Sequence, residues 1–242
     1  MSSLVVFGAT SAIAQAYLNR VSKRYDSITV VARNEKHLAQ VVAHLQVISR
    51  ATVSSLLWDL ADEKSHSELL QKIDSKMETV LICYGELGNQ EKCIQDTEYA
   101  RQQFRLNGTS VISLSAQVAK VLIRQQSGVL AVVGSVAGDR GRSSNYYYGA
   151  AKAAVDAFLS GLRADVLRAG VRVVTVKPGF VDTPMTRDFK KGLLWAKPEK
   201  VAIDMDRAIS GHAEILYTPW FWRYVMLIIK CLPEKVFKRL SI

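Results

Sequence analysis

Short apolar runs recur along this 242-residue chain at the spacing of a sheet whose strands are separated by helices. The runs are rich in Val, Ile and Leu and are continuously apolar, as expected for strands that are covered on both faces. Stretches with helical periodicity lie between them. The predicted strands are residues 4–7, 27–31, 53–57, 79–83, 129–133, 171–177 and 214–217.

This alternation of strand and helix indicates parallel βαβ units. We therefore predict an α/β fold with a single doubly wound Rossmann domain, a central parallel sheet of about seven strands and a C-terminal helical extension. The nucleotide-binding and catalytic part would occupy residues 1–217, and residues 218–242 would form a basic, aromatic helical tail of the same domain. No linker, repeat or low-complexity segment divides the chain.

Composition and charge narrow the classes of protein that fit. The start of the chain has no basic residues ahead of a short apolar run, which predicts neither a signal sequence nor a membrane span and favours a cytoplasmic protein. Three cysteines and four histidines without close ligand spacing predict reduced thiols and no metal site. The net charge of +10 is compatible with an anionic partner, but no nucleic-acid motif accompanies it.

Three successive tyrosines, at positions 146 to 148, begin a helical pattern that extends to residue 169. Asn145 and Gly170 are suitable N-cap and C-cap residues. Residues four apart on a helix share a face, so only Tyr148 is expected to present its hydroxyl beside the ammonium of Lys152. A nearby cation should lower the pKa of the phenol and make it a usable general acid or base, although the pair alone could be an ordinary surface pair.

Further candidate residues follow the predicted strands. Ser135 ends the fifth strand, where the carboxyl end of a parallel strand faces the ligand crevice. The first strand leads into a turn of small residues, 8–14, where a diphosphate could lie against backbone N–H groups. Ala32-Arg33 follows the second strand, at the position of the acidic residue that would bind the ribose of NAD. An arginine there suits the 2′-phosphate of NADP. The alternative is an ordinary surface arginine at the end of a strand.

In combination these residues resemble the short-chain dehydrogenase/reductase family over essentially the whole chain. The resemblance implies a carbonyl reductase or alcohol dehydrogenase that uses NADP(H) in preference to NAD(H). It gives Tyr148 the role of proton donor, with Lys152 lowering its pKa, Ser135 holding the carbonyl oxygen and Asn107 supporting a proton relay. The residues expected at NADP(H) are Gly8, Thr10, Ser11, Ala12, Ile13, Arg33, Asp59, Leu60, Tyr84, Gly85, Tyr148, Lys152, Pro178, Gly179, Val181 and Thr183.

Singly, some of these residues have simpler interpretations. Asp59 could cap a helix, Asn107 could be a buried polar residue, and Pro178-Gly179 could be a turn. The sequence also departs from the family pattern, because Ala12 and Ala14 stand where glycine is usual and add two methyl groups near the diphosphate site. Cys83-Tyr84-Gly85 replaces the usual Asn-Ala-Gly and puts a tyrosine on the floor of the cofactor site.

The tail is the third departure. It contains Trp220-Phe221-Trp222 and five basic residues against one acidic residue, and its apolar part is too short to span a bilayer. Two interpretations remain open, a helix that lies in an anionic membrane interface and a segment that packs across the substrate cleft or a subunit interface.

The tail and the turn at 10–14 resemble a subgroup that includes the decaprenylphosphoryl 2-keto-pentose reductases, which implies a lipid-linked ketosugar as substrate. By family resemblance the protein would be a homodimer or homotetramer, located in the cytoplasm or at the inner face of the membrane. Two other classes of function compete with the enzyme: a non-catalytic nucleotide-binding scaffold, and a peripheral membrane protein that acts through its tail.

Overall fold

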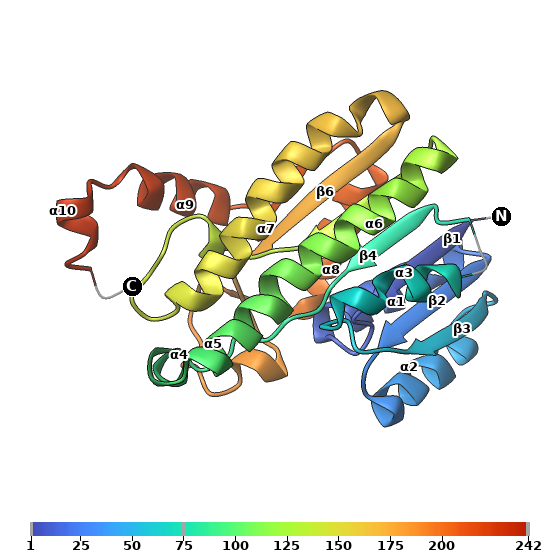
Figure 1. Cartoon of the computed structure of the whole chain (residues 1–242), viewed down its shortest axis with the longest axis horizontal. Coiled ribbons are helices and arrows are strands. Elements are labelled where there is room, and N and C mark those ends of the chain that lie inside the picture. Colours follow the sequence, from blue (N-terminus) through green and yellow to red (C-terminus); the bar gives the residue numbers. More distant parts are fainter. Residues whose placement is uncertain (1, 74–75, 241–242) are drawn as a thin grey trace.

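The computed structural model describes residues 2–73 and 76–240, so the first residue and the last two residues of the predicted domain and tail, and residues 74–75, lie outside it. Seven parallel strands form one sheet in the order β3-β2-β1-β4-β5-β6-β9, with helices on both faces (Figure 1). All seven predicted strands are present, and no end is shifted by more than one residue. They are β1 Ser3–Phe7, β2 Ser27–Ala32, β3 Thr52–Leu57, β4 Thr79–Ile82, β5 Gly128–Val133, β6 Val171–Pro178 and β9 Ile215–Thr218.

The sheet is buried on both faces because successive side chains of a strand point to opposite sides. In β1, Leu4 and Val6 pack on one face, whereas Val5 and Phe7 pack on the other. The prediction of cover on both faces is wrong for β3, whose residues are exposed or half-buried along the strand. β3 is the edge strand of the sheet and pairs only with β2.

Three helices cover each face. One face is covered by α1 (Ala12–Val21), α2 (Glu35–Ile48) and α8 (Pro198–Ser210). The other face is covered by α3 (His66–Gln71), α6 (Ser110–Gln125) and α7 (Tyr146–Asp165), with α6 and α7 side by side (Figure 1). Short 3₁₀ turns lie between these elements: η1 Ser22–Arg24, η2 Glu63–Ser65, η4 Val136–Gly138, η5 Leu167–Ala169 and η6 Pro184–Thr186.

α6 continues a longer helical segment. After α4 (Gln90–Gln95), α5 (Thr97–Phe104) leads into α6 through one π-helical turn, η3 (Arg105–Thr109). The segment from Thr97 to Gln125 is long and apolar enough to cross a bilayer by length and composition, but half of its most apolar window is buried inside the protein. That burial is typical of a core helix.

The long predicted helix after the tyrosines is shorter than expected. α7 ends at Asp165, η5 follows, and Gly170 closes the segment with a φ of 68° that favours glycine. Asn145 precedes α7, but its side chain makes no capping hydrogen bond. Its backbone carbonyl accepts the Gly149 N–H instead.

The tail forms α9 (Trp222–Cys231) and α10 (Glu234–Phe237) on the side of the molecule away from the N-terminus (Figure 1). Trp222, Met226 and Ile229 of α9 are buried against Val136 and Phe237. The guanidinium of Arg140 donates to the carbonyls of Ile229 and Leu232 and lies 3.8 Å from the Phe237 ring centroid. One side of the tail therefore packs on the protein, next to the short parallel pair β7 (Phe180–Val181) and β8 (Trp195–Ala196).

Candidate active site

Two adjoining cavities, of about 310 and 190 Å³, lie at the carboxyl ends of the parallel strands. Every predicted site residue except Asn107 lines one of them. The larger is lined by Ala12, Ile13, Ser135, Tyr148, Lys152, Pro178, Gly179, Val181 and Thr183. The smaller is lined by Gly8, Arg33, Asp59 and Leu60, and Thr10, Ser11, Tyr84 and Gly85 line both.

The first turns of α7 bring Tyr148 and Lys152 to the same side of the helix, as predicted. The Lys152 Nζ lies 5.7 Å from the Tyr148 ring centroid and donates to the Val133 carbonyl at 3.3 Å. The Tyr148 hydroxyl is hydrogen-bonded to Ser135. Ser135 follows β5, and its Oγ accepts the Ala137 N–H, which fixes the hydroxyl at the cavity wall.

The expected fall in the pKa of Tyr148 is wrong for this structure. Burial raises the pKa of Tyr148 to about 12, and the hydrogen bond from Ser135 opposes only part of that shift. Burial also lowers the pKa of Lys152 to about 8, although Cys83 and Asp156 act in the other direction. Both pKa values are shifted toward the neutral form because water is excluded from the surroundings of the two groups.

Tyr146 and Tyr147 lie outside both cavities. Their rings stack on each other with centroids 4.9 Å apart, and the Tyr147 N–H donates to Gln90. Of the three successive tyrosines, Tyr148 is the one whose hydroxyl faces the site.

Asn107 lies behind the larger cavity, in the π-helical turn. Its Oδ1 accepts the Glu86 N–H at 3.0 Å, and its Nδ2 donates to the Gln103 carbonyl at 3.1 Å. A Cβ at Gly85 would lie 2.6 Å from this Oδ1, so only glycine fits the loop there. The Asn107 side chain thus fixes the segment that separates the two cavities.

A sequence model of the family described as short chain dehydrogenase matches residues 2–193. The chain belongs to the short chain dehydrogenase family. It is therefore an oxidoreductase of the NAD(P)-dependent kind.

Several relatives and solved structures share this family's fold. An uncharacterized oxidoreductase of Mycobacterium tuberculosis is 30% identical over 98% of this chain and 96% of its own length. A 3-oxoacyl-[acyl-carrier-protein] reductase of Escherichia coli is 28% identical over 80% of this chain and 81% of its own. Among solved structures, a short chain dehydrogenase from Burkholderia cenocepacia in complex with NADP has a TM-score of 0.84 at 18% identity, with 100% and 98% of the two chains covered. A short-chain dehydrogenase from Sphingobium yanoikuyae in complex with NADPH has a TM-score of 0.82 at 20% identity, with 97% of each chain covered.

The turn after β1 fits a dinucleotide of the kind that short chain dehydrogenases use. Gly8 has a φ of 84°, and a Cβ there would lie 2.6 Å from the Cys83 carbonyl oxygen, so the close approach of β1 and β4 requires glycine. The expectation that both alanines crowd the diphosphate is wrong for Ala14, which is fully buried in the core below α1. Only the Ala12 methyl group faces the cavity.

The smaller cavity is lined by Arg33 and Asp59, two of the residues predicted to bind NADP(H). The Arg33 guanidinium is 62% exposed and lies 3.7 Å from the Glu86 carboxylate, so it is loosely paired. Asp59 Oδ1 accepts the Ala61 N–H, which shapes the turn after β3. Tyr84 is not free on the floor of the site, because its hydroxyl is hydrogen-bonded to Ser110 of α6.

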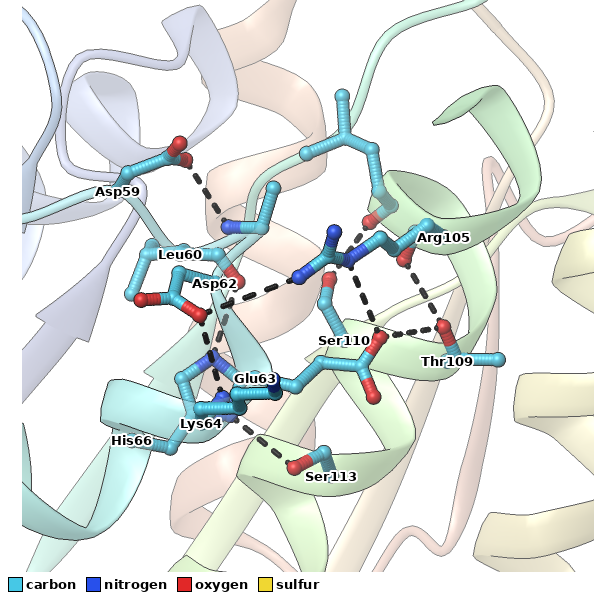
Figure 2. A network of polar contacts seen from close by, with 12 residues as sticks. Asp59, Leu60, Asp62, Glu63, Lys64, His66, Arg105, Thr109, Ser110 and Ser113 are labelled. Carbon is cyan, nitrogen blue, oxygen red and sulfur yellow. Dashed lines mark hydrogen bonds and ion pairs between the residues drawn. The ribbon is translucent and has the colours of Figure 1, made fainter. Parts of the chain in front are cut away.

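A polar network holds the turn after β3 to the π-helical turn (Figure 2). Arg105 contacts the carboxylates of Asp62 and Glu63, and the Thr109 hydroxyl donates to Glu63 at 2.7 Å. The buried His66 imidazole bridges the Leu60 carbonyl, at 2.9 Å, and the Ser113 hydroxyl, at 3.2 Å. The turn after β3, which lines the smaller cavity, and the segment that carries Asn107 are therefore fixed to each other.

Some residues of the larger cavity are not among the predicted site residues. Arg142 is buried in its wall, and Leu87, Phe180, Met185 and Phe189 provide apolar surface. A Cβ at Gly179 would overlap the Trp222 indole, so this glycine also makes room for α9. An isolated arginine and scattered apolar residues become recognisable as a site only when the fold brings them together.

Proposed function

We propose that this short chain dehydrogenase reduces a ketone to an alcohol with NADP(H), with Tyr148 as the proton donor. The observation that supports this most is the group formed by Ser135, Tyr148 and Lys152 in one cavity beside the dinucleotide turn. When bound, the nicotinamide supplies a hydride to the carbonyl carbon.

The chain's own residues would stabilise the negative charge that develops on the substrate oxygen. Ser135 donates a hydrogen bond to that oxygen, and Tyr148 transfers its phenolic proton to it, which completes the alcohol. Lys152 in its ammonium form stabilises the phenolate that is left, and Asn107 keeps the Gly85-Glu86 segment in place.

The preference for NADP(H) is part of the proposal. Ala32 and Arg33 leave no acidic side chain at the end of β2, and Arg33 lines the smaller cavity. Two similar solved structures are complexes with NADP and NADPH. For the ketone, the apolar wall of the cavity and the resemblance of the tail make a lipid-linked ketosugar the first class to screen.

Tyr148→Phe tests the chemistry, since it removes one oxygen and keeps the ring. We expect turnover of any accepted ketone to fall about 1000-fold, as for loss of a general acid, while NADPH binding and melting temperature stay near wild type. Tyr147→Phe is the matched control and should keep its rate. An unchanged rate in Tyr148→Phe would show that this phenol is not the acid and would favour the scaffold hypothesis.

A second proposal concerns the outer side of the tail. Trp220, Tyr224, Leu227 and Ile228 recur at helical spacing and are 68%, 58%, 57% and 63% exposed. Arg223 and Lys230 lie on the same exposed side of α9. We propose that this lipid-facing stripe binds the anionic inner surface of a membrane, which would bring a lipid-linked ketone to the cavity.

Co-sedimentation with vesicles tests the stripe. Binding to vesicles that contain phosphatidylglycerol should exceed binding to phosphatidylcholine alone and should weaken at high salt. Leu227→Ser with Ile228→Ser should abolish it, whereas Val47→Ser, at a more exposed apolar site on α2, should not. Wild type that binds neither kind of vesicle would contradict the membrane proposal. If light scattering then gives a different molecular mass for the double variant, the stripe is a contact between copies of the chain. We also propose that the protein forms a homodimer or homotetramer.

A further inference from the structure

Arg142 is a buried cation in the wall of the larger cavity. It lies between η4 and α7, six residues before Tyr148, and only 6% of it is exposed. In the described part of the chain its buried Nε has no hydrogen-bond partner. Its Nη2 donates to the Met226 thioether at 3.3 Å, which is a weak acceptor.

No ion pair joins Arg142 to a carboxylate within the described residues. Asp139 is the acid whose charge reaches it, but both oxygens of that carboxylate are in use. One accepts from Lys177 at 2.5 Å and the other accepts from the Tyr217 hydroxyl at 2.8 Å. A buried guanidinium without a close anion is costly, and burial accordingly lowers the pKa of Arg142.

The charged side chains that line the cavity around Arg142 all have the same sign. Among its described lining residues, Arg142 and Lys152 are cationic and none is acidic. Arg142 is also far from the smaller cavity, because it follows β5 and contacts α9, whereas that cavity lies at β1, β2 and β3. The dinucleotide turn at Thr10 forms a different part of the lining.

We propose that Arg142 binds an oxyanion of the substrate, a phosphate or a carboxylate, while the ketone lies at Ser135 and Tyr148. A guanidinium binds such a group through two parallel hydrogen bonds, and no described protein group accepts a hydrogen bond from the Arg142 Nε–H. The inference rests on the proposed function for the ketone. It assigns the substrate class as an anionic ketone whose remaining part contacts the apolar wall.

The direct test is calorimetric titration of inorganic phosphate into the protein saturated with NADP⁺, repeated without nucleotide, with acetate as a second probe. Arg142→Met keeps an unbranched apolar stem and removes the guanidinium, so it should weaken phosphate binding at least about tenfold. Arg124→Met removes an exposed cation from α6 and should leave phosphate binding unchanged. If Arg142→Met weakens phosphate binding more than acetate binding, the oxyanion is a phosphate, and the reverse result indicates a carboxylate.

The kinetic test compares dihydroxyacetone phosphate with dihydroxyacetone. Arg142→Met should lower kcat/KM for the phosphorylated ketone at least about tenfold and leave the neutral ketone unaffected. Equal phosphate affinity in wild type and Arg142→Met would overturn the proposal and make Arg142 a structural cation balanced by Asp139. If Arg142→Met does not fold, the same comparison of phosphate affinity with Arg142→Gln tests the proposal. NADPH titration of each preparation separates this failure from failure of the proposed function, which would appear as absent nucleotide binding.

Discussion

Single residues in this site owe their properties to burial more than to their neighbours in sequence. The spacing of Tyr148 and Lys152 predicts that they share a face, and they do. The same spacing predicts a lowered pKa for the phenol, but burial raises that pKa, and the hydrogen bond with Ser135 opposes only part of the rise. The spacing of residues in the sequence shows which side chains share a face of a helix. The exclusion of water from a side chain depends on segments from elsewhere in the chain.

Arg33 should determine the choice between the two nicotinamide nucleotides. Its guanidinium is exposed and only loosely paired with Glu86, so it is available to a 2′-phosphate. We expect Arg33→Ala to weaken NADPH binding about tenfold and to leave NADH binding unchanged, as measured by nucleotide fluorescence. Arg101→Ala, on the exposed surface of α5, serves as control. Equal losses for both nucleotides would show that Arg33 does not contact the 2′-phosphate.

At the scale of elements, the turn after β3 depends on His66. Burial lowers the pKa of His66 below its ordinary value of about 6.5. The unfolded chain therefore takes up a proton at a higher pH than the folded chain, and the stability contributed by neutral His66 is complete above that value and is lost as the pH falls through it.

Thermal unfolding between pH 8 and pH 5 tests this dependence. His66→Gln should have a lower melting temperature than wild type at pH 8, because the bridge from Leu60 to Ser113 is altered, and the difference should shrink at lower pH. His212→Gln, which removes an exposed imidazole, should follow the wild-type curve. A constant difference between His66→Gln and wild type at all pH values would contradict the assignment.

The types of most elements could be predicted from the sequence, but the exposed edge strand and the π-helical turn could not. Val, Ile and Leu runs locate the strands because any strand of a covered parallel sheet must be apolar on both sides. The edge position of β3, with Ser54 and Ser55, depends on strand order rather than on the run itself. Likewise nothing in Arg105 to Thr109 marks a π-helical turn, and the contact of Trp222 with Gly179 joins residues far apart in the chain.

At the scale of the whole molecule, one buried ionic cluster joins four distant segments. The Lys177 ammonium of β6 contacts Asp139, after η4, at 2.5 Å and Asp156, on α7, at 2.9 Å. Tyr217 of β9 donates to Asp139. Burial alone would lower the pKa of Lys177, but the two carboxylates raise it above its ordinary value.

Loss of the shared cation should destabilise the fold strongly. Lys177→Met leaves two buried carboxylates without their partner, and we expect it to lower the free energy of unfolding by about 3–5 kcal/mol. Lys72→Met breaks an exposed pair with Glu68, at 3.0 Å, and it should cost about 0.5 kcal/mol. Urea unfolding of both variants measures the difference, and similar losses would mean that burial of the cluster is unimportant.

The π-helical turn at Arg105–Thr109 makes this stretch sensitive to chain length. A π turn accommodates one residue more than an α turn between the same two ends. Deleting a single residue there would allow regular α-helix from Thr97 to Gln125 with α5 and α6 keeping their faces, but the turn that places Asn107 would be lost. Asn107 would then lose the Glu86 N–H, so a one-residue deletion in this helix would be more disruptive than many substitutions.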